Sequence, residues 1–182
     1  MKINWIDRGL MAGLVCVGLL LAAGCGGNGG ASGTTDAGAA LPARYLLDSA
    51  PGGATPIIEL KANAKEGDEV VVHVVVGGVD SPIVADRASA TVIDAGVVNP
   101  CTKEDDHCDT PWDYCCTPNE DKTPNLATLQ VVDDAGKVLA ADLTAHFNPL
   151  ATLIVKGVVG PRANDEVLTI HATGIYVESA AP

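Results

Sequence analysis

The sequence is short of positive charge and of aromatic side chains. Lysine and arginine together number 11, against 23 aspartates and glutamates, so the formal net charge at pH 7 is −12. Only 3% of the residues are phenylalanine, tryptophan or tyrosine. Acidic proteins are repelled by nucleic acid and by anionic lipid surfaces, and single-strand binders need basic grooves with stacking aromatics. The composition therefore argues against nucleic acid as a partner.

The motifs of common catalytic sites are also missing. The chain contains no G-x-S-x-G nucleophile motif, no H-E-x-x-H zinc-protease motif and no glycine-rich phosphate-binding loop. It has no C-x-x-C pair of the kind used in thiol-redox exchange. The histidines are scattered along the chain, at His73, His107, His146 and His171. No catalytic residue and no cofactor is predicted, and the protein is expected to be non-enzymatic.

The longest apolar run lies at the N-terminus. Residues 10–21 read LMAGLVCVGLLL, about half of the roughly 20 residues that span a bilayer, which fits the apolar region of a signal peptide. The following LAAGC, which ends at Cys25, resembles the lipobox of bacterial lipoproteins. That resemblance implies that residues 1–24 are a cleaved lipoprotein signal peptide and that Cys25 carries acyl chains such as palmitate. The alternative is an ordinary signal peptide that leaves Cys25 as a spare thiol.

A lipidated Cys25 would attach the protein to a membrane without spanning it, because two or more acyl chains give stable anchorage. The expected location is the cell envelope, on the periplasmic face of a membrane or on the cell surface. Residues 25–54 are expected to be a lipid-anchored linker, since residues 26–40 are rich in glycine and alanine and lack periodicity. Within residues 41–54, the side chains of Tyr45, Leu46 and Leu47 are candidates to pack on the domain that follows.

Residues 55–182 are expected to form one domain of mainly β structure. Thr55-Pro56 is typical of a helix start, with Thr55 as the N-cap of a short helix over residues 57–65. Asp134-Ala135-Gly136 predicts a hairpin turn. Strands rich in β-branched residues are predicted, between turn signals, over residues 69–77, 88–94, 127–133, 137–140, 152–159 and 167–177.

Two of these strands share a form that indicates how the sheet closes. Residues 70–77 and 153–160 are long, rich in valine and end in glycine. A five-stranded Greek-key barrel needs long first and fourth strands of this kind, because each serves two sheet edges. Residues 66–178 resemble the OB-fold, which implies a small OB-like five-stranded barrel with a long cysteine loop at residues 99–125. A β-sandwich is the alternative.

The cysteine loop contains four of the six cysteines, with the spacing C-x6-C-x6-C-C at Cys101, Cys108, Cys115 and Cys116. In an exported protein such cysteines typically form two disulfides, which would staple the loop. A bond between the adjacent Cys115 and Cys116 would be strained, which leaves 101–115 with 108–116, or 101–116 with 108–115.

Metal and redox sites are the alternatives for the same cysteines. A metal centre would use them together with His107, but cysteines that bind zinc usually lie two to four residues apart. The redox alternative lacks the C-x-x-C pair. We therefore predict no metal.

The cysteine loop also carries many carboxylates and two of the few aromatic residues. The carboxylates lack the alternating D-x-D-x-D-G pattern of calcium loops, which favours a solvated acidic surface. Trp112 and Tyr114 form a candidate binding surface, because exposed tryptophan and tyrosine often anchor partners. The alternative is that both residues pack over the disulfides and the rim of the barrel.

Residues 110–116, TPWDYCC, resemble a group of uncharacterised exported bacterial lipoproteins that also have a leader, a Gly-rich tether and an ending like ATGIYV, here at residues 172–177. The resemblance implies export and an OB-type barrel, and it implies no activity. The favoured function is a non-enzymatic, membrane-tethered binding or structural module for an unknown protein or small-molecule ligand. The alternatives are a metal-handling or thiol-redox protein, and an OB-fold binder of oligonucleotides or oligosaccharides.

The leader predicts a modified N-terminus. Protein isolated from membranes should begin at Cys25 and carry the mass of its acyl chains, because the lipobox directs cleavage before that cysteine. Intact-mass analysis and N-terminal peptide mapping measure both properties. An unmodified Cys25, or a mature chain that begins elsewhere, would contradict the lipoprotein assignment.

Overall fold

The computed structural model describes residues 38–103 and 108–181, which all belong to one compact unit, Thr34–Pro182. The predicted signal peptide, the lipidation site Cys25 and His107 of the cysteine loop lie outside the described residues. Within the described ranges, none of the helices has the length and apolar character needed to cross a membrane.

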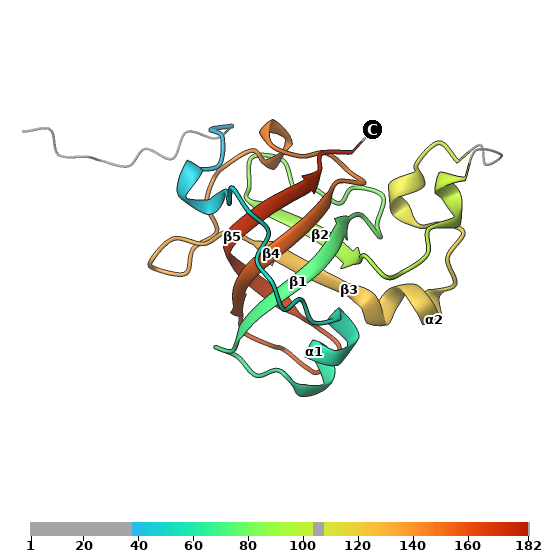
Figure 1. The fold of residues 1–182 in the computed structure, drawn as a ribbon, viewed down its shortest axis with the longest axis horizontal. Helices are drawn as coiled ribbons and strands as arrows, with labels where there is room; N and C mark the ends of the chain where they lie inside the picture. The colour runs from blue at the N-terminus through green and yellow to red at the C-terminus, as the bar shows by residue number, and fades with distance from the viewer. Residues whose placement is uncertain (1–37, 104–107, 182) are drawn as a thin grey trace, which may run out of the picture. The chain divides into compact units, whose positions relative to one another are not determined.

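The domain is a closed barrel of five strands (Figure 1). The strands are β1 Glu69–Val76, β2 Ser89–Asp94, β3 Leu126–Gln130, β4 Thr152–Val159 and β5 Thr169–Ser179. Their order around the barrel is β1-β2-β3-β5-β4, and neighbours are antiparallel except for the parallel pair β3 and β5. This arrangement confirms the predicted mainly-β, OB-like barrel, and closure of the sheet rules out the β-sandwich.

Strand β1 closes the barrel because it pairs along both of its edges. Residues 69–75 pair with β4, and residues 74–76 pair with β2. Its alternate valines Val70, Val72, Val74 and Val76 are buried in the core, where they meet Leu153 and Val155 of β4 among other residues. The run of valines therefore does what the sequence predicted: one strand serves two sheet edges.

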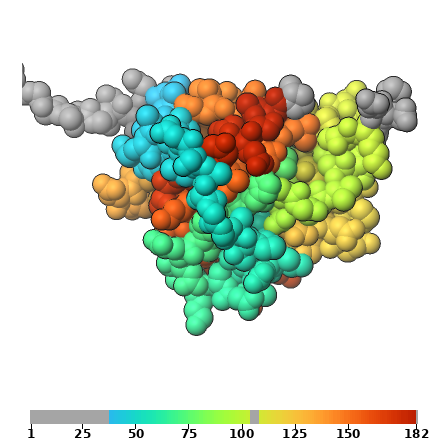
Figure 2. Space-filling view, viewed as in Figure 1, coloured from blue at the N-terminus to red at the C-terminus, as the bar shows by residue number. Residues whose placement is uncertain are grey.

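The segment before the first helix packs on the barrel. Leu41 is buried, Leu46 forms a parallel bridge with Ile175 of β5, and the Leu47 N–H donates to the Ile175 carbonyl at 2.8 Å. This segment, blue to teal in Figures 1 and 2, runs across the face of the barrel toward helix α1. The described part of the segment predicted as linker therefore contacts the barrel, and the expected packing of Leu46 is confirmed.

Helix α1, Ile57–Asn63, covers one end of the barrel with Ile57 and Leu60. Its N-cap residue is Pro56 rather than the predicted Thr55, and the Ile57 N–H donates instead to the Asp94 carboxylate of β2 at 2.9 Å. The helix ends before the predicted Lys65. Arg162, from the β4–β5 connection, donates to the carbonyls of Lys61 and Ala64 at 2.9 and 2.7 Å and so satisfies the helix C-terminus.

The predicted strand over residues 137–140 is reduced to a single bridge between Val132 and Val138. The turn before it forms as expected: the Asp133 N–H donates to the Lys137 carbonyl at 2.9 Å, and Gly136 has a φ of +77°. The residues that follow are irregular, with one short turn at Leu143–Ala145, because Leu143 and Phe147 turn into the core. Side-chain burial outweighs strand propensity here.

Strand β4 crosses β5 closely at Gly157, beside a register shift between Lys156 and Gly157. A Cβ at this position would lie 2.6 Å from the carbonyl oxygen of His171 and 2.8 Å from Cγ2 of Ile170. Gly157→Ala should therefore lower the free energy of unfolding by about 1–3 kcal/mol, because backbone atoms cannot give way. Urea denaturation followed by far-UV circular dichroism measures this.

The matched control for this prediction is Gly52→Ala. Gly52 has a negative φ and no atom within 4 Å of an added Cβ, so its substitution should change stability by less than about 0.5 kcal/mol. Equal stability of the two variants would show that the crossing at Gly157 is not tight.

Candidate functional site

The cysteine loop, residues 99–125, connects β2 to β3 and stands at one side of the barrel, yellow-green to yellow in Figure 1. Its described residues are folded into short helical turns rather than an open coil. They are η2 Pro100–Thr102, η3 Pro111–Asp113, α2 Asn119–Lys122 and η4 Thr123–Asn125. Proline opens η2 and η3, directly precedes α2 and is the second residue of η4, and its fixed φ suits the start of a helical turn. The described part of the loop, called the lobe from here on, is therefore folded and can hold side chains in defined positions.

Main-chain contacts dock this lobe on the β1–β2 connection. The Gly78 N–H donates to the Trp112 carbonyl at 2.7 Å, and the Trp112 indole N–H donates to the Asp80 carbonyl at 2.7 Å. Gly77 makes the close approach possible, since a Cβ there would lie 2.5 Å from the Trp112 carbonyl oxygen. Trp112 is half-buried in this contact, so one part of its ring system faces solvent.

Tyr114 is buried, with 2% of its surface exposed, and this differs from its place in the predicted binding surface. Its ring lies near Gly77, where an added Cβ would be 3.3 Å from Tyr114 Cε2. The residue adopts a left-handed conformation with a φ of +57°, and burial raises the pKa of its hydroxyl. Tyr114 thus follows the packing alternative and is unavailable to a partner in this structure. Of the two aromatics, Trp112 alone retains exposed surface.

The tight turn at Tyr114 is held by Asp113. Its carboxylate accepts the Cys115 N–H at 2.7 Å and the Thr110 hydroxyl at 2.9 Å. Partial burial raises the pKa of this carboxyl, but the two hydrogen bonds and the charge of Lys122 outweigh it and hold the pKa below its ordinary value. The Asp113 carboxylate therefore serves the turn that brings Cys115 back toward Cys101.

The sulfurs of the loop converge on Cys115. Its Sγ lies 3.2 Å from Sγ of Cys108, 3.4 Å from Sγ of Cys101 and 3.6 Å from Sγ of Cys116. The Cys116 N–H donates to Sγ of Cys101 at 3.4 Å. Cys101 is buried, Cys108 is half-buried, and Cys115 is exposed, so the cluster runs from the base of the lobe to its surface. Residues spaced far apart in sequence thus meet at one point.

The two disulfide pairings predicted for these cysteines both remain predictions. A disulfide bond brings sulfurs to about 2.05 Å, and the printed contacts of Cys115 with Cys101 and Cys108 are longer and nearly equal. Because Cys115 is adjacent to both, its position favours neither 101–115 nor 108–115. The geometry describes the thiol form of the cluster.

Hydrogen bonds shift the pKa values of the Cys101 and Cys115 thiols in opposite directions. Burial raises the pKa of the Cys101 thiol, but hydrogen bonds from Cys116, Cys115 and Cys108 outweigh it and hold that pKa below its ordinary value. Hydrogen bonds with the sulfurs of Cys108, Cys101 and Cys116 raise the pKa of Cys115 far above its ordinary value. Cys101 is therefore ionised more readily than Cys115, since the thiol and N–H contacts around Cys101 favour its thiolate.

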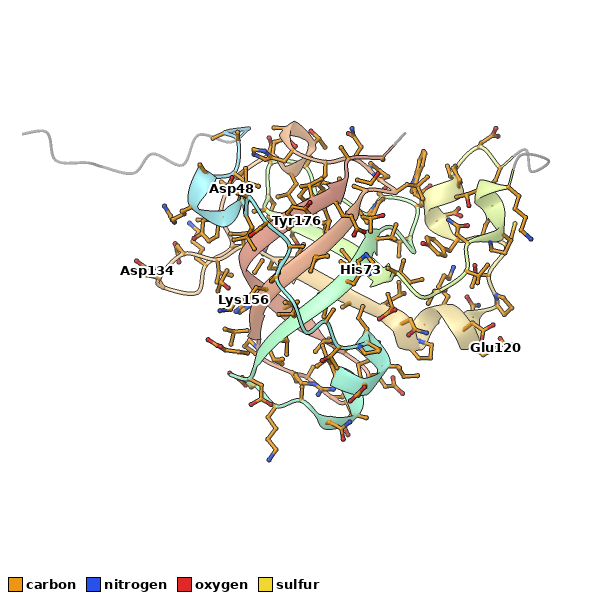
Figure 3. The ribbon with its side chains drawn as sticks, in the orientation of Figure 1. Asp48, His73, Glu120, Asp134, Lys156 and Tyr176 are labelled. Carbon is orange, nitrogen blue, oxygen red and sulfur yellow. The ribbon has the colours of Figure 1, made fainter. Side chains whose placement is uncertain are left out.

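A groove of about 430 Å³ lies between the lobe, the end of β2 and helix α1. Ile58 of α1 and Val98 contribute apolar surface to it, and these residues are 52% and 72% exposed. Glu120 and Asp121 of α2 also line the groove, and Figure 3 labels Glu120 on that helix. No motif marks these residues in the sequence; the groove arises only when α1 and the lobe come together.

The face of β2 and β3, which many OB-folds use for oligonucleotides and oligosaccharides, carries a shallower hollow of about 260 Å³. Threonines Thr91 and Thr128 line it, together with one lysine, Lys61, and one glutamate, Glu166. None of its lining residues is aromatic, so the face lacks the stacking platforms of single-strand binders. This chemistry gives no support to the oligonucleotide alternative.

The described histidines do not form a site. His73 Nε2 lies 2.9 Å from a Glu178 carboxylate oxygen on the surface of the barrel, where both side chains are exposed (Figure 3 labels His73). The His171 ring packs against Gly160, and His146 Nε2 is buried without a hydrogen-bond partner. These three histidines lie apart, as their sequence positions predicted.

Comparisons with protein-family models, with curated proteins and with solved structures give no match to this chain.

Docking of the lobe should depend on the absence of a side chain at Gly77. Gly77→Ala places a methyl group against the Trp112 carbonyl, so it should displace the lobe and lower stability by about 1–3 kcal/mol. Emission from Trp112 in the folded protein should shift to longer wavelength as the indole gains water. Gly157→Ala is the control, since it should lower stability without changing that emission. An unchanged spectrum in Gly77→Ala would show that the lobe is not held here.

Proposed function

We propose that the protein is a non-enzymatic, membrane-tethered binding module whose ligand site is the groove between the lobe and α1. The observation that carries this proposal is the combination of exposed Ile58 and Val98 with the carboxylates of Glu120 and Asp121 in one groove of about 430 Å³. Ligand sites are typically concave, with apolar walls and a few polar groups that fix orientation. The barrel and the docked lobe supply rigid walls.

The chemistry of the groove favours a basic, amphipathic segment of a partner protein. Such a segment would place apolar side chains against Ile58 and Val98 and a lysine or arginine near Glu120 and Asp121. The net charge of −12 adds long-range attraction for a cationic ligand. The same charge opposes nucleic acid and anionic lipid.

The tether rests on the leader and on the lipobox-like residues that end at Cys25. An acylated Cys25 would keep the domain within reach of one membrane, and the glycine-rich residues after it would let the domain turn freely toward its partner. Tethering confines the search for a partner to that surface, so a modest intrinsic affinity is sufficient.

A labelled amphipathic peptide of lysine and leucine tests the groove. Fluorescence anisotropy should detect its binding to the mature protein, and a glutamate–leucine peptide of the same length should bind weakly. Val98→Asp should weaken binding of the basic peptide about tenfold or more, a change of about 1.4 kcal/mol, because it puts a charge against the apolar wall. The double variant Glu120→Gln, Asp121→Asn should weaken binding and reduce its dependence on salt.

Val84→Asp is the matched control, since Val84 is a similarly exposed valine, at 46%, outside the groove. Its affinity for the basic peptide should equal that of the unmodified protein. Equal weakening by Val84→Asp and Val98→Asp, or equal binding of both peptides, would show that the groove is not the ligand site.

A further inference from the structure

The cysteine cluster has the geometry of a single coordination centre. Ligand sulfurs of Cys101, Cys108 and Cys115 all lie within 4.8 Å of one another. Two of the three separations are 3.4 and 3.2 Å. With a zinc–sulfur distance of about 2.3 Å, the edge of a tetrahedron of sulfurs is about 3.8 Å. Each separation between these sulfurs therefore needs to change by about 1 Å or less for the three to surround an ion.

We propose that the thiol form of the lobe binds one thiophilic d10 cation of the Zn²⁺ type through Sγ of Cys101, Cys108 and Cys115. This site is independent of the groove and adds a second ligand class to the protein. Thiolates select soft or borderline-soft ions over Mg²⁺ and Ca²⁺. Binding of Zn²⁺ by three thiols forms three zinc–sulfur bonds and releases three protons. The affinity for Zn²⁺ should therefore decrease as the pH is lowered.

The surroundings of the sulfurs fit a ligand set. The Cys116 N–H points at Sγ of Cys101, at 3.4 Å, and would offset negative charge on that thiolate. Asp113 accepts the Cys115 N–H at 2.7 Å and fixes the main chain that carries Cys115. Outer hydrogen bonds of this kind orient metal ligands and tune their basicity. The lobe thus prepares the sulfurs before any ion arrives.

The spacing C-x6-C-x6-C argued against zinc because most zinc ligands sit two to four residues apart in a single turn. Here the fold of the lobe, rather than a short spacing in sequence, brings the three sulfurs together. The short helix η2 carries Cys101, and η3 followed by the left-handed turn at Tyr114 returns the chain to it at Cys115. Sequence spacing is therefore a poor guide to ligand distance in this loop.

The cluster is also open to entry and exit of an ion. Cys101 forms its buried base, whereas Cys115 is exposed. Three protein ligands leave a fourth tetrahedral position for water, for an incoming ligand or for Sγ of Cys116, which lies 3.6 Å from Sγ of Cys115. The metal-bound and disulfide-bonded forms use the same sulfurs, so they exclude each other.

Titration with Co²⁺ as a spectroscopic probe tests the site. The full mature chain is reduced and handled without oxygen, and tetrahedral cobalt–thiolate absorption in the visible range is followed. We expect one equivalent per chain, displacement of cobalt by Zn²⁺, and weaker binding at lower pH. Cys101→Ser, Cys108→Ser and Cys115→Ser should each weaken binding at least tenfold.

Glu120→Gln is the control, because Glu120 lies on α2 of the same lobe and lines the groove rather than belonging to the group of sulfurs. It should bind cobalt like the unmodified protein. X-ray absorption of the zinc-loaded, unmodified chain gives a second measurement that needs no variant, and it should count three or four sulfurs at about 2.3 Å. Absence of a thiolate spectrum, fewer than three sulfurs, or equal binding by all the serine variants would overturn the proposal. None of these results bears on peptide binding in the groove.

Discussion

Pairing of β1 along both edges is the constraint on which the rest of the structure depends. Val74 and Val75 of this strand face partners on β2 and on β4, and the sheet closes through them. Closure leaves no free edge on the described barrel and encloses a core of aliphatic side chains with one phenylalanine, Phe147. It also fixes where β1 ends. The chain leaves the barrel at Gly77 and Gly78, so the docking point of the cysteine loop is set by the same strand.

Two sites of different character result from this one docking event. On one side, the lobe and α1 enclose a groove with apolar walls and carboxylates. Within the lobe, turns held by Asp113 and by the prolines gather the cysteines. Both sites lie on the connection between β2 and β3, and neither uses the β2–β3 face. Both proposed sites therefore involve the inserted loop, in keeping with the rule that folds position sites without dictating them.

The sequence predicted the barrel well because each strand carries its own signal. Valine-rich β1 and β4 match their predicted ranges to within one residue, and Gly136 marks a real turn. Prediction failed where distant residues decide the outcome. Residues 137–140 make one bridge because nearby apolar side chains turn inward, and Tyr114 is buried because Gly77 admits its ring. The proximity of the cysteines could not be predicted either, because it depends on how the turns of the lobe fold back and not on the spacing of the cysteines along the chain.

The segment that crosses the barrel before α1 has a mechanical consequence. In a tethered protein, a pull on the N-terminal side reaches the domain through residues 41–47, where Leu46 and Leu47 hold Ile175 by a short parallel bridge. Under such a pull, these few contacts would break before the paired strands of the closed barrel separate. If the chain is anchored at Cys25 as proposed, residues 41–47 would therefore yield to such a pull first. The barrel and the lobe with its cysteines would keep their shape under load.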